Sequence, residues 1–361
     1  MKLIPFVCSL LFTAAFALPA PSPDPQDTKT CTSPPLRKEW RTLSDEEKLN
    51  YITAVKCMQK LPAISTGAVP GAVSRYDDFV GVHVRDANTI HFVGHTLPWH
   101  RYFVAKFEEA MINECNYTGG QPYWDFTLDS AKEEDFLASP IFDPGPLGFG
   151  GNGPWIAESI DPFPPAPGRT GGGCVQDGAF KDSVVRLGPR ENIQLNERCL
   201  TRDFSPWIAT TFLSAQLVKD TLDQTTFGWF DVKAQGKIQN VYTYRYHGGG
   251  HLAIGGELGT LADVWSSAGD PLFYLHHTNM DRLWWEWQKK DLPARLYDIS
   301  NPIYPFDFPY GNATSRGNVT LEFEMPFHEV AKTVTIGDTM DIMGETLCYD
   351  YAPSPEKSNC Y

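Results

Sequence analysis

Eight of the nine histidines of this 361-residue chain lie in two clusters, and this feature most constrains what the chain can fold into. The clusters are His83, His91, His95 and His100, and His247, His251, His276 and His277, with His328 outside both. A lone histidine is usually a surface or core residue, but two such groups, each followed by a predicted helix, suggest two metal ions with three ligands apiece. Imidazole suits copper, zinc, iron and nickel, and no carboxylate recurs at ligand spacing within a cluster. The sequence therefore predicts two all-imidazole metal sites.

In the second cluster, His247 and His251 are four residues apart, which on a helix places both rings on one face, one turn apart. Their third partner has to come from another element. His277 is the candidate, because the Asp-Pro pair at 270–271 is a strong N-cap and first helical residue for a helix that would carry it. Asp281 follows His277 by one turn. We expect its carboxylate to accept a hydrogen bond from His277 and to fix the orientation of that ring.

In the first cluster, His91 and His100 are nine residues apart, which leaves them about 180° apart on one straight helix. They could not share a metal in that arrangement. Pro98 resolves the difficulty, because it allows His91 to lie on a loop or an earlier turn while His100 opens the next helix. His83 would then come from the preceding segment.

Caps and apolar periodicity predict a mainly helical fold with long loops and minor β structure. A capping box of Ser44 with Glu47 opens the first helix. The helices are expected at 44–61, 97–115, 207–222, 247–255 and 270–290. Residues 118–176 are rich in Gly and Pro and are expected to form a packed irregular loop or a binding loop, and 293–361 to hold short strands. We predict one catalytic domain, 31–361.

The N-terminus has the pattern of an exported protein. Residues 1–17 combine a basic start, an apolar run and a small-x-small site, which predicts a signal peptide. The run is shorter than the roughly 20 residues that a membrane-spanning helix needs. Residues 18–30 are expected to form a Pro-rich linker or pro-region. Sequons at Asn116, Asn312 and Asn318 are candidate glycosylation sites.

Removal of the signal peptide leaves seven cysteines, which in an oxidising compartment suggests three disulfides and one free thiol. Sequence does not fix the connectivity, and the pairing we expect is Cys57–Cys115, Cys174–Cys199, and Cys31 with Cys348 or Cys360. The net charge of −14 and the lack of a basic cluster argue against nucleic acid or an anionic membrane as a partner.

At the predicted ligands the chain resembles the tyrosinase family. The second copper signature of that family is Asp-Pro-x-Phe, an aromatic or aliphatic residue, two residues, the ligand His, three residues and Asp. Residues 270–281 read Asp-Pro-Leu-Phe-Tyr-Leu-His-His-Thr-Asn-Met-Asp, which selects His277 and not His276. The first signature ends in Trp-His-Arg with a later Glu, matched by 99–101 and Glu108. Thr96 departs from it, because the family has Phe there.

The resemblance extends from about Trp40 to Tyr351. The segments Glu39-Trp40-Arg41 and Tyr349-Asp350-Tyr351 resemble the family's paired terminal elements, in which an Arg packs on a Tyr-x-Tyr motif. Few residues follow that motif here. The chain is therefore similar to the short, secreted fungal-type members, without the shielding C-terminal domain of others.

The resemblance implies a four-helix bundle around a dinuclear copper centre. Copper A would be held by His83, His91 and His100, and copper B by His247, His251 and His277. Many relatives join the second copper A histidine to a Cys two residues earlier. Here that position is Thr89, so no thioether is expected.

By the same resemblance, the function is oxidation of o-diphenols to o-quinones by dioxygen, with a small phenol and dioxygen as partners. Efficient monophenol hydroxylation in relatives often uses an Asn after the first copper B histidine, which together with an acidic residue holds a water. Gly248 stands there, so we expect weak or no monophenol hydroxylation. Gln239 is a possible water-holding partner and Val264 a possible gate of the pocket.

Several alternatives stay open at this point. Within the family they are a full tyrosinase and an o-aminophenol oxidase, and outside it a haemocyanin-like dioxygen carrier or a zinc hydrolase. His95 and His276 are candidates for supporting the ligands, whereas His328 is expected to bind no metal. Glu108 is expected to orient its neighbours, and Trp284, Trp285 and Trp287 to pack the core.

Overall fold

The structure, a computed structural model, describes residues 31–157, 166–236, 244–305 and 317–355. The predicted signal peptide (1–17) and linker (18–30) lie outside the described residues, as do Gln239, Asn312 and Cys360. Asn116 and Asn318, the two sequons within the described ranges, are both exposed.

The chain is mainly helical with minor β structure, as predicted. The helices are α1 (Asp45–Met58), α2 (Arg75–Ile90), α3 (Thr96–Cys115), α4 (Glu133–Leu137), α5 (Pro206–Phe212), α6 (Ala215–Leu222), α7 (Phe227–Gln235), α8 (Tyr246–Gly255) and α9 (Leu272–Lys289). The strands are β1 (Leu36–Arg37), β2 (Val184–Val185), β3 (Arg198–Cys199), β4 (Glu324–Phe327), β5 (Ala331–Thr335) and β6 (Asp350–Tyr351). They pair as β1 with β6 in parallel, and as β2 with β3 and β4 with β5 antiparallel.

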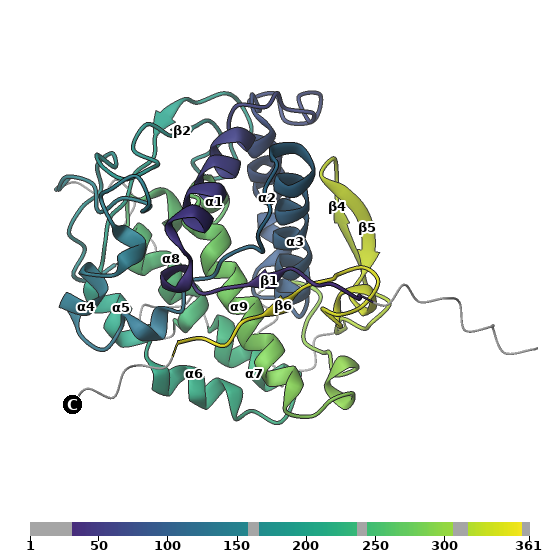
Figure 1. The fold of residues 1–361 in the computed structure, drawn as a ribbon. Coiled ribbons are helices and arrows are strands. Elements are labelled where there is room, and N and C mark those ends of the chain that lie inside the picture. Colours follow the sequence, from purple (N-terminus) through teal and green to yellow (C-terminus); the bar gives the residue numbers. More distant parts are fainter. Residues whose placement is uncertain (1–30, 158–165, 237–243, 306–316, 356–361) are drawn as a thin grey trace, which may run out of the picture.

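The helices α2, α3, α8 and α9 form the central bundle (Figure 1), and α9 is buried along almost its whole length. It packs against both α3 and α8. The sequence predicted α3, α8 and α9 but not α2, which begins at a capping box of its own. The Asp270 carboxylate accepts from the N–H of Leu272 at 3.0 Å at the start of α9, and it forms a buried ion pair with Arg202. The capping box of Ser44 and Glu47 opens α1.

Two predictions about the outer helices were wrong or incomplete. Residues 207–222 form two helices, α5 and α6, because the Ser214 hydroxyl caps a new helix by accepting from the N–H of Leu217. The helix α7 was not predicted. It follows from the cap of Thr226, whose hydroxyl accepts from the N–H of Trp229.

Three disulfides tie distant segments together, and all three predicted pairs are confirmed. Cys57–Cys115 joins the ends of α1 and α3, and Cys174–Cys199 holds the long loop to β3. Cys31 pairs with Cys348, one of its two predicted alternatives, and so locks the N-terminal segment beside β6.

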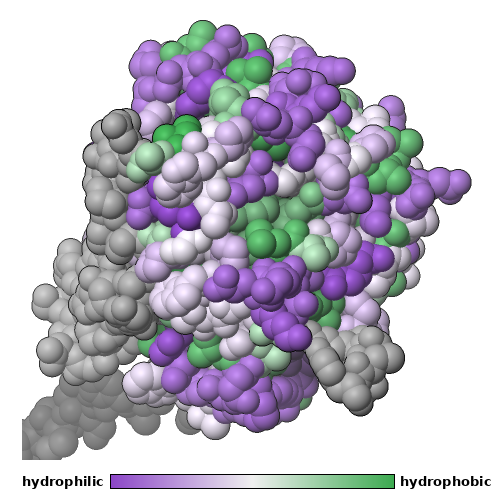
Figure 2. Space-filling model, turned by 90° about the vertical axis from the view of Figure 1, so that its left-hand side faces the viewer, coloured by the Kyte–Doolittle hydropathy of each residue, from purple (hydrophilic) through white to green (hydrophobic). Residues whose placement is uncertain are grey.

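The loop 118–176, where it is described, is a packed irregular segment and not an open one. It buries Trp124, Phe126, Phe136, Phe142 and Phe149 against the helices. Figure 2 shows the side of the molecule that lies on the left in Figure 1, where hydrophobic residues reach the surface in separate areas among hydrophilic ones. Within the described ranges, no helix combines the length and the apolar character that a membrane crossing requires.

Candidate metal centre

The first group of histidines forms where α2 ends and α3 begins. His83 lies on α2, and His91 is the residue that terminates α2, with an extended backbone (φ −114°, ψ 145°). His100 lies in the first turns of α3, two residues after Pro98. The predicted break between His91 and His100 is confirmed, and it turns all three rings toward one point. Their ring centroids form a triangle with sides of 5.2, 5.6 and 5.2 Å.

The second group is built from two helices. His247 and His251 lie one turn apart on α8, as predicted, and His277 reaches them from α9. The ring centroids of this group form a triangle with sides of 5.1, 5.2 and 5.2 Å. In each group the three imidazoles offer one nitrogen apiece within 4.8 Å of one another, which is a geometry that a metal ion can bridge.

The two triangles face each other across the bundle. The rings of His100 and His277 are stacked, with centroids 4.2 Å apart and planes 11° apart. His91 and His247 form a second stacked pair at 6.0 Å. Two groups in this arrangement can hold two metal ions side by side.

Backbone carbonyls fix which imidazole nitrogen is available. The Nδ1 atoms of His83, His91, His100 and His251 lie 2.6–2.9 Å from the carbonyl oxygens of Trp265, Ala87, Thr96 and Leu261, in that order. A carbonyl only accepts, so Nδ1 carries the proton in these four rings and Nε2 presents its lone pair.

Three of the six Nε2 atoms have no hydrogen-bond partner among the described residues. Nε2 of His83, His100 and His247 is buried without a hydrogen bond among the described residues. The Nε2 atoms of His251 and His277 lie 3.1 Å apart. Buried polar atoms normally find partners, so these unpartnered nitrogens within an all-imidazole donor set fit a cation at each group.

Burial keeps the imidazoles neutral. It lowers the pKa of His91 and His251 to about 4. The pKa values of His83, His100 and His277 fall well below their usual value, first because of burial and second because neighbouring imidazoles disfavour another charge. Neutral imidazole is the form that binds metal, so at neutral pH these histidines need not lose a proton before a metal ion binds.

A narrow cavity leads to the second group. Its lining is His91, Phe92, Gln235, Tyr244, His247, Gly248, His251, Leu252, Ala262, Val264 and Ser267. The structure thus places Gly248 and Val264, two residues predicted for the pocket, in its wall. A Cβ at position 248 would have no neighbour closer than 3.7 Å, so space for a side chain exists there.

Gln235 is a cavity residue that the sequence did not reveal, because α7 was not predicted and no motif surrounds it. Its amide oxygen accepts from the N–H of Phe92, and its nitrogen donates to the Val93 carbonyl and to Asp231. The side chain therefore ties α7 to the loop that follows His91.

Asp281 does not act as predicted. Its two oxygens are occupied by the guanidinium groups of Arg37 and Arg101 and by the hydroxyls of Tyr349 and Tyr351, and no hydrogen bond between the described residues Asp281 and His277 is present. Two buried arginines attract a carboxylate more strongly than a neutral imidazole does.

We name the buried group of Arg37, Arg101, Glu108, Asp281, Tyr349 and Tyr351 the Asp281 cluster. Glu108 accepts from Arg37 and from the N–H of Gln121, which agrees with its predicted orienting role. Arg37 is the arginine that packs on the Tyr-x-Tyr motif, with its guanidinium carbon 3.4 Å from the ring centroid of Tyr349. Arg41, within the predicted motif, instead pairs with Glu39 and Asp129.

The remaining predicted residues lie around this core. Trp284, Trp285 and Trp287 are buried, as predicted, and Thr96 is buried with its hydroxyl donating to the Val93 carbonyl. Thr89 is exposed. The ring of His95 lies on Phe323, and His328 pairs with Asp86 at 2.8 Å, outside both triangles.

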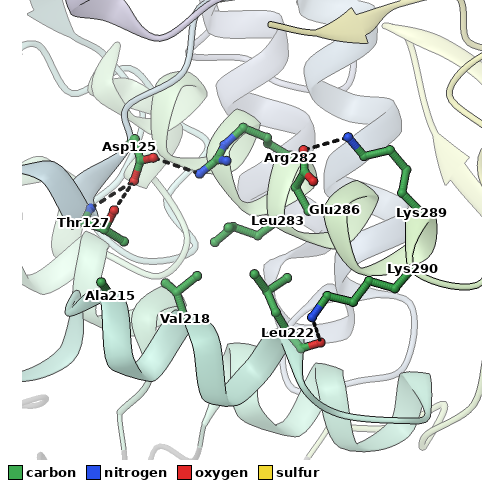
Figure 3. A pocket seen from close by; sticks show the side chains of 10 residues that line it. All are labelled: Asp125, Thr127, Ala215, Val218, Leu222, Arg282, Leu283, Glu286, Lys289 and Lys290. Atoms are coloured by element: carbon green, nitrogen blue, oxygen red, sulfur yellow. Dashed lines mark hydrogen bonds and ion pairs between the residues drawn. The ribbon is translucent and has the colours of Figure 1, made fainter. Parts of the chain in front are cut away.

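A second hollow lies between α6 and α9, away from the histidines (Figure 3). Its polar groups have partners: Arg282 pairs with Asp125, Lys289 with Glu286, and Lys290 donates to the carbonyl of Leu222. It offers no unsatisfied group of the kind that marks the histidine site.

Comparison with known proteins agrees with this fold and site. Residues 73–290 match the family model described as the common central domain of tyrosinase. Tyrosinase P of Aspergillus terreus is 34% identical over 345 residues, which cover 89% of this chain and 93% of the relative. The N-acetyl-6-hydroxytryptophan oxidase ivoB of Emericella nidulans is 34% identical over 358 residues, covering 88% and 92%. The structure of a polyphenol oxidase mutant from Thermothelomyces thermophila covers 88% of each chain at 32% identity, with a TM-score of 0.77.

Fold, site and comparisons together define an oxidase built on a helical bundle with two facing groups of three histidines. The chain belongs to the tyrosinase family, whose members are type 3 dicopper proteins.

Proposed function

We propose that the protein is a copper-dependent oxidase of o-diphenols, with copper A held by His83, His91 and His100 and copper B by His247, His251 and His277. The observation that carries the proposal is the pair of facing triangles of neutral imidazoles, in which Nε2 of His83, His100 and His247 has no partner among the described residues. A copper pair bound there would relay electrons from the catechol to dioxygen, two for each catechol that is oxidised to its o-quinone.

The protein contributes rigid placement and a dry pocket. The carbonyls that accept from Nδ1 hold each ring in one orientation, which favours one metal geometry. Phe92, Leu252 and Val264 give the cavity apolar walls that suit a single aromatic ring and limit the access of water. The substrate would be a small phenol, with dioxygen as the second reactant.

Weak or absent monophenol hydroxylation follows from the chemistry of the cavity wall. Gly248 has no side chain to hold a water near copper B. Gln235 lines the same cavity, but its amide is already committed to Phe92, Val93 and Asp231. Within the described part of the wall no carboxylate stands ready to take the proton of a phenol. Gln239, the predicted water-holding partner, lies outside the described residues.

The alternatives within the family are a full tyrosinase and an oxidase of o-aminophenols or related hydroxyarenes. The name of the Emericella nidulans relative, an oxidase of a hydroxytryptophan, makes hydroxyindoles a substrate class to include. A haemocyanin-like carrier would bind dioxygen without turnover, and a zinc hydrolase would retain zinc. We also propose export from the cell, supported by three disulfides and by the signal-like segment 1–17.

The test is oxygen uptake by the purified, copper-loaded protein with a monophenol, its matching catechol, an o-aminophenol and a hydroxyindole, together with metal analysis. We expect rapid catechol oxidation and little monophenol reaction, with the His277→Ala variant inactive on all four. Gly248→Asn is the matched gain-of-function variant, because the cavity has room for its side chain. It should raise the ratio of monophenol to catechol rates. Comparable wild-type rates on both substrates would make the protein a tyrosinase, and oxygen binding without turnover would make it a carrier.

A further inference from the structure

Helix α8 contains three consecutive glycines between its two ligand histidines, which is costly for a helix. Each glycine destabilises a helix interior by about 1 kcal/mol relative to alanine. Gly248 opens on the cavity, and Gly249 lies where a Cβ would come 2.7 Å from Phe212. Gly250 is the most tightly enclosed by a single side chain: its Cβ would lie 2.2 Å from Cε1 of His276. The missing side chain at position 250 is therefore what admits the ring of His276.

His276 is fully buried between α8 and α9, directly before the ligand His277. Its Nε2 lies 3.0 Å from the carbonyl oxygen of His247. Because a carbonyl only accepts, Nε2 carries the proton and donates. The ring is parallel to that of His247 and meets that of His251 edge-on at 5.0 Å. Thus the imidazole of His276 contacts both ligand residues of α8, and the third ligand, His277, is the next residue in the chain.

We propose that His276 is a positioning residue for the second group of histidines. Its Nε2–H, which donates to the His247 carbonyl, fixes the position of α8 along the axis of α9. Its ring, which packs against Gly250, fixes the distance between the two helices. This inference rests on the proposed function, since the quantity it controls is the affinity of the second group for copper.

The structure also separates this role from ordinary core packing. Nδ1 of His276 is buried with no hydrogen-bond partner among the described residues. A side chain needed only for packing would be more stable without that unsatisfied nitrogen. Histidine suits this position because its ring is flat and its donor lies at the tip of the ring.

The test compares copper binding by wild type, His276→Phe and His276→Gln through competition with a chelator, with each site's occupancy counted. Phe keeps a flat ring and loses the donor, whereas Gln keeps a donor and loses the ring. We expect His276→Phe to weaken one of the two coppers by about 10–100-fold, the range for residues that orient metal ligands, with the other copper unchanged. His276→Gln should recover part of that loss. His95→Phe is the matched control, because this buried imidazole lies on Phe323 and outside both triangles.

Gly250 provides a second test that needs no copper. Gly250→Ala should lower the melting temperature of the metal-free protein, because its Cβ displaces the imidazole. In a His276→Ala background, the same substitution should raise the melting temperature, since alanine favours helix and the ring is gone. This reversal keeps the inference testable if His276→Phe does not fold.

The outcomes are distinguishable. If wild type holds two coppers and His276→Phe holds both with equal affinity, the inference is overturned and the proposed function stands. A Gln variant that binds more weakly than the Phe variant, or a Gly250→Ala effect of the same sign in both backgrounds, overturns it as well. If wild type itself binds no copper, the proposed function fails, whatever the variants do.

Discussion

The same two helices, α3 and α9, carry two buried polar regions with opposite properties. At one position along them, His100 and His277 face each other as neutral rings: Nε2 of His100 has no partner among the described residues, and Nε2 of His277 lies 3.1 Å from that of His251. One residue after His100 and one turn after His277, Arg101 and Asp281 form a charged pair within the Asp281 cluster. There the carboxylate of Asp281 has four partners from α3, β1 and the C-terminal segment.

The difference separates a binding site from a structural junction. A cluster whose donors and acceptors are matched holds elements together and has little left for a ligand. A cluster of uncharged, unpartnered nitrogens is costly to bury and is completed only when a ligand arrives. The Asp281 cluster joins β1 and the segment around β6 to α3 and α9. It therefore fixes the two helices that carry His100 and His277.

The largest expected difference between the two regions is their response to acid. Eight histidines, seven of them buried and His251 partly exposed, have folded-state pKa values below their usual 6.5, and those of His91 and His251 are about 4. The unfolded chain therefore binds more protons, and stability present above pH 6.5 is lost as the pH falls toward 4. Each histidine contributes about 1.4 kcal/mol per pH unit within its window, so eight approach the whole stability of a domain, about 5–15 kcal/mol.

We expect the metal-free protein to unfold between about pH 6.5 and 5 in urea titrations followed by circular dichroism, and copper to delay that loss. Burial raises the pKa of Glu39 to about 7 and also raises that of Asp86, which acts in the opposite direction but through two carboxyls against eight imidazoles. A urea midpoint that stays constant from pH 7 to 5 would contradict neutral, buried imidazoles.

The next largest effect is expected from Asp281→Ala. This change leaves Arg101 buried without a counter-charge, whereas Arg37 keeps Glu108, and an unpaired buried charge typically costs about 3–5 kcal/mol. Urea unfolding of the metal-free variant at pH 7.5 measures the loss. Glu329→Ala, which removes an ion pair with Arg85 near the surface, is the control and should change stability by less than about 1 kcal/mol. Equal losses for both would refute a structural role for the cluster.

A smaller effect is expected from Tyr349→Phe. Its hydroxyl donates to Asp281 at 2.6 Å, and a hydrogen bond to a charged group contributes about 1.5–3 kcal/mol. Asp281 keeps both arginines and Tyr351, so the loss should lie near the lower limit. In an Asp281→Ala background the same substitution should cost much less. An undiminished cost there would show that the hydroxyl acts through another partner.

The histidine site could be predicted from the sequence because its signals are local. The i,i+4 spacing of His247 and His251, the cap at Asp270 and the position of Pro98 in the first turn of α3 each specify geometry within a few residues. The Asp281 cluster could not be predicted this way, because Asp281 meets partners at positions 37, 101, 349 and 351 that only the tertiary fold brings together.

The same reason explains the other errors. The sequence favoured Arg41 over Arg37 as the arginine that packs on the Tyr-x-Tyr motif. The strands β1 and β6 have two residues each, which is too short for a periodic pattern, so their pairing could not be predicted. Gln235 was missed because its partners follow His91, far from it in sequence. The sequence analysis did not single out Gly250, because its contact with His276 is visible only in three dimensions.

The smallest effect on stability, and the sharpest contrast, is expected from His100→Leu. The two side chains have similar volume, and the Thr96 carbonyl that His100 contacts still has the backbone N–H of position 100 in the helix. Replacing an imidazole with a buried, unpartnered nitrogen by an apolar group is close to neutral, so the metal-free variant should unfold within about 1 kcal/mol of wild type. Copper content should nevertheless fall from two to one and oxygen uptake to background. If His100→Leu lowered the stability of the metal-free protein as much as Asp281→Ala does, the imidazoles would support the fold. The two regions would then differ in charge but not in role.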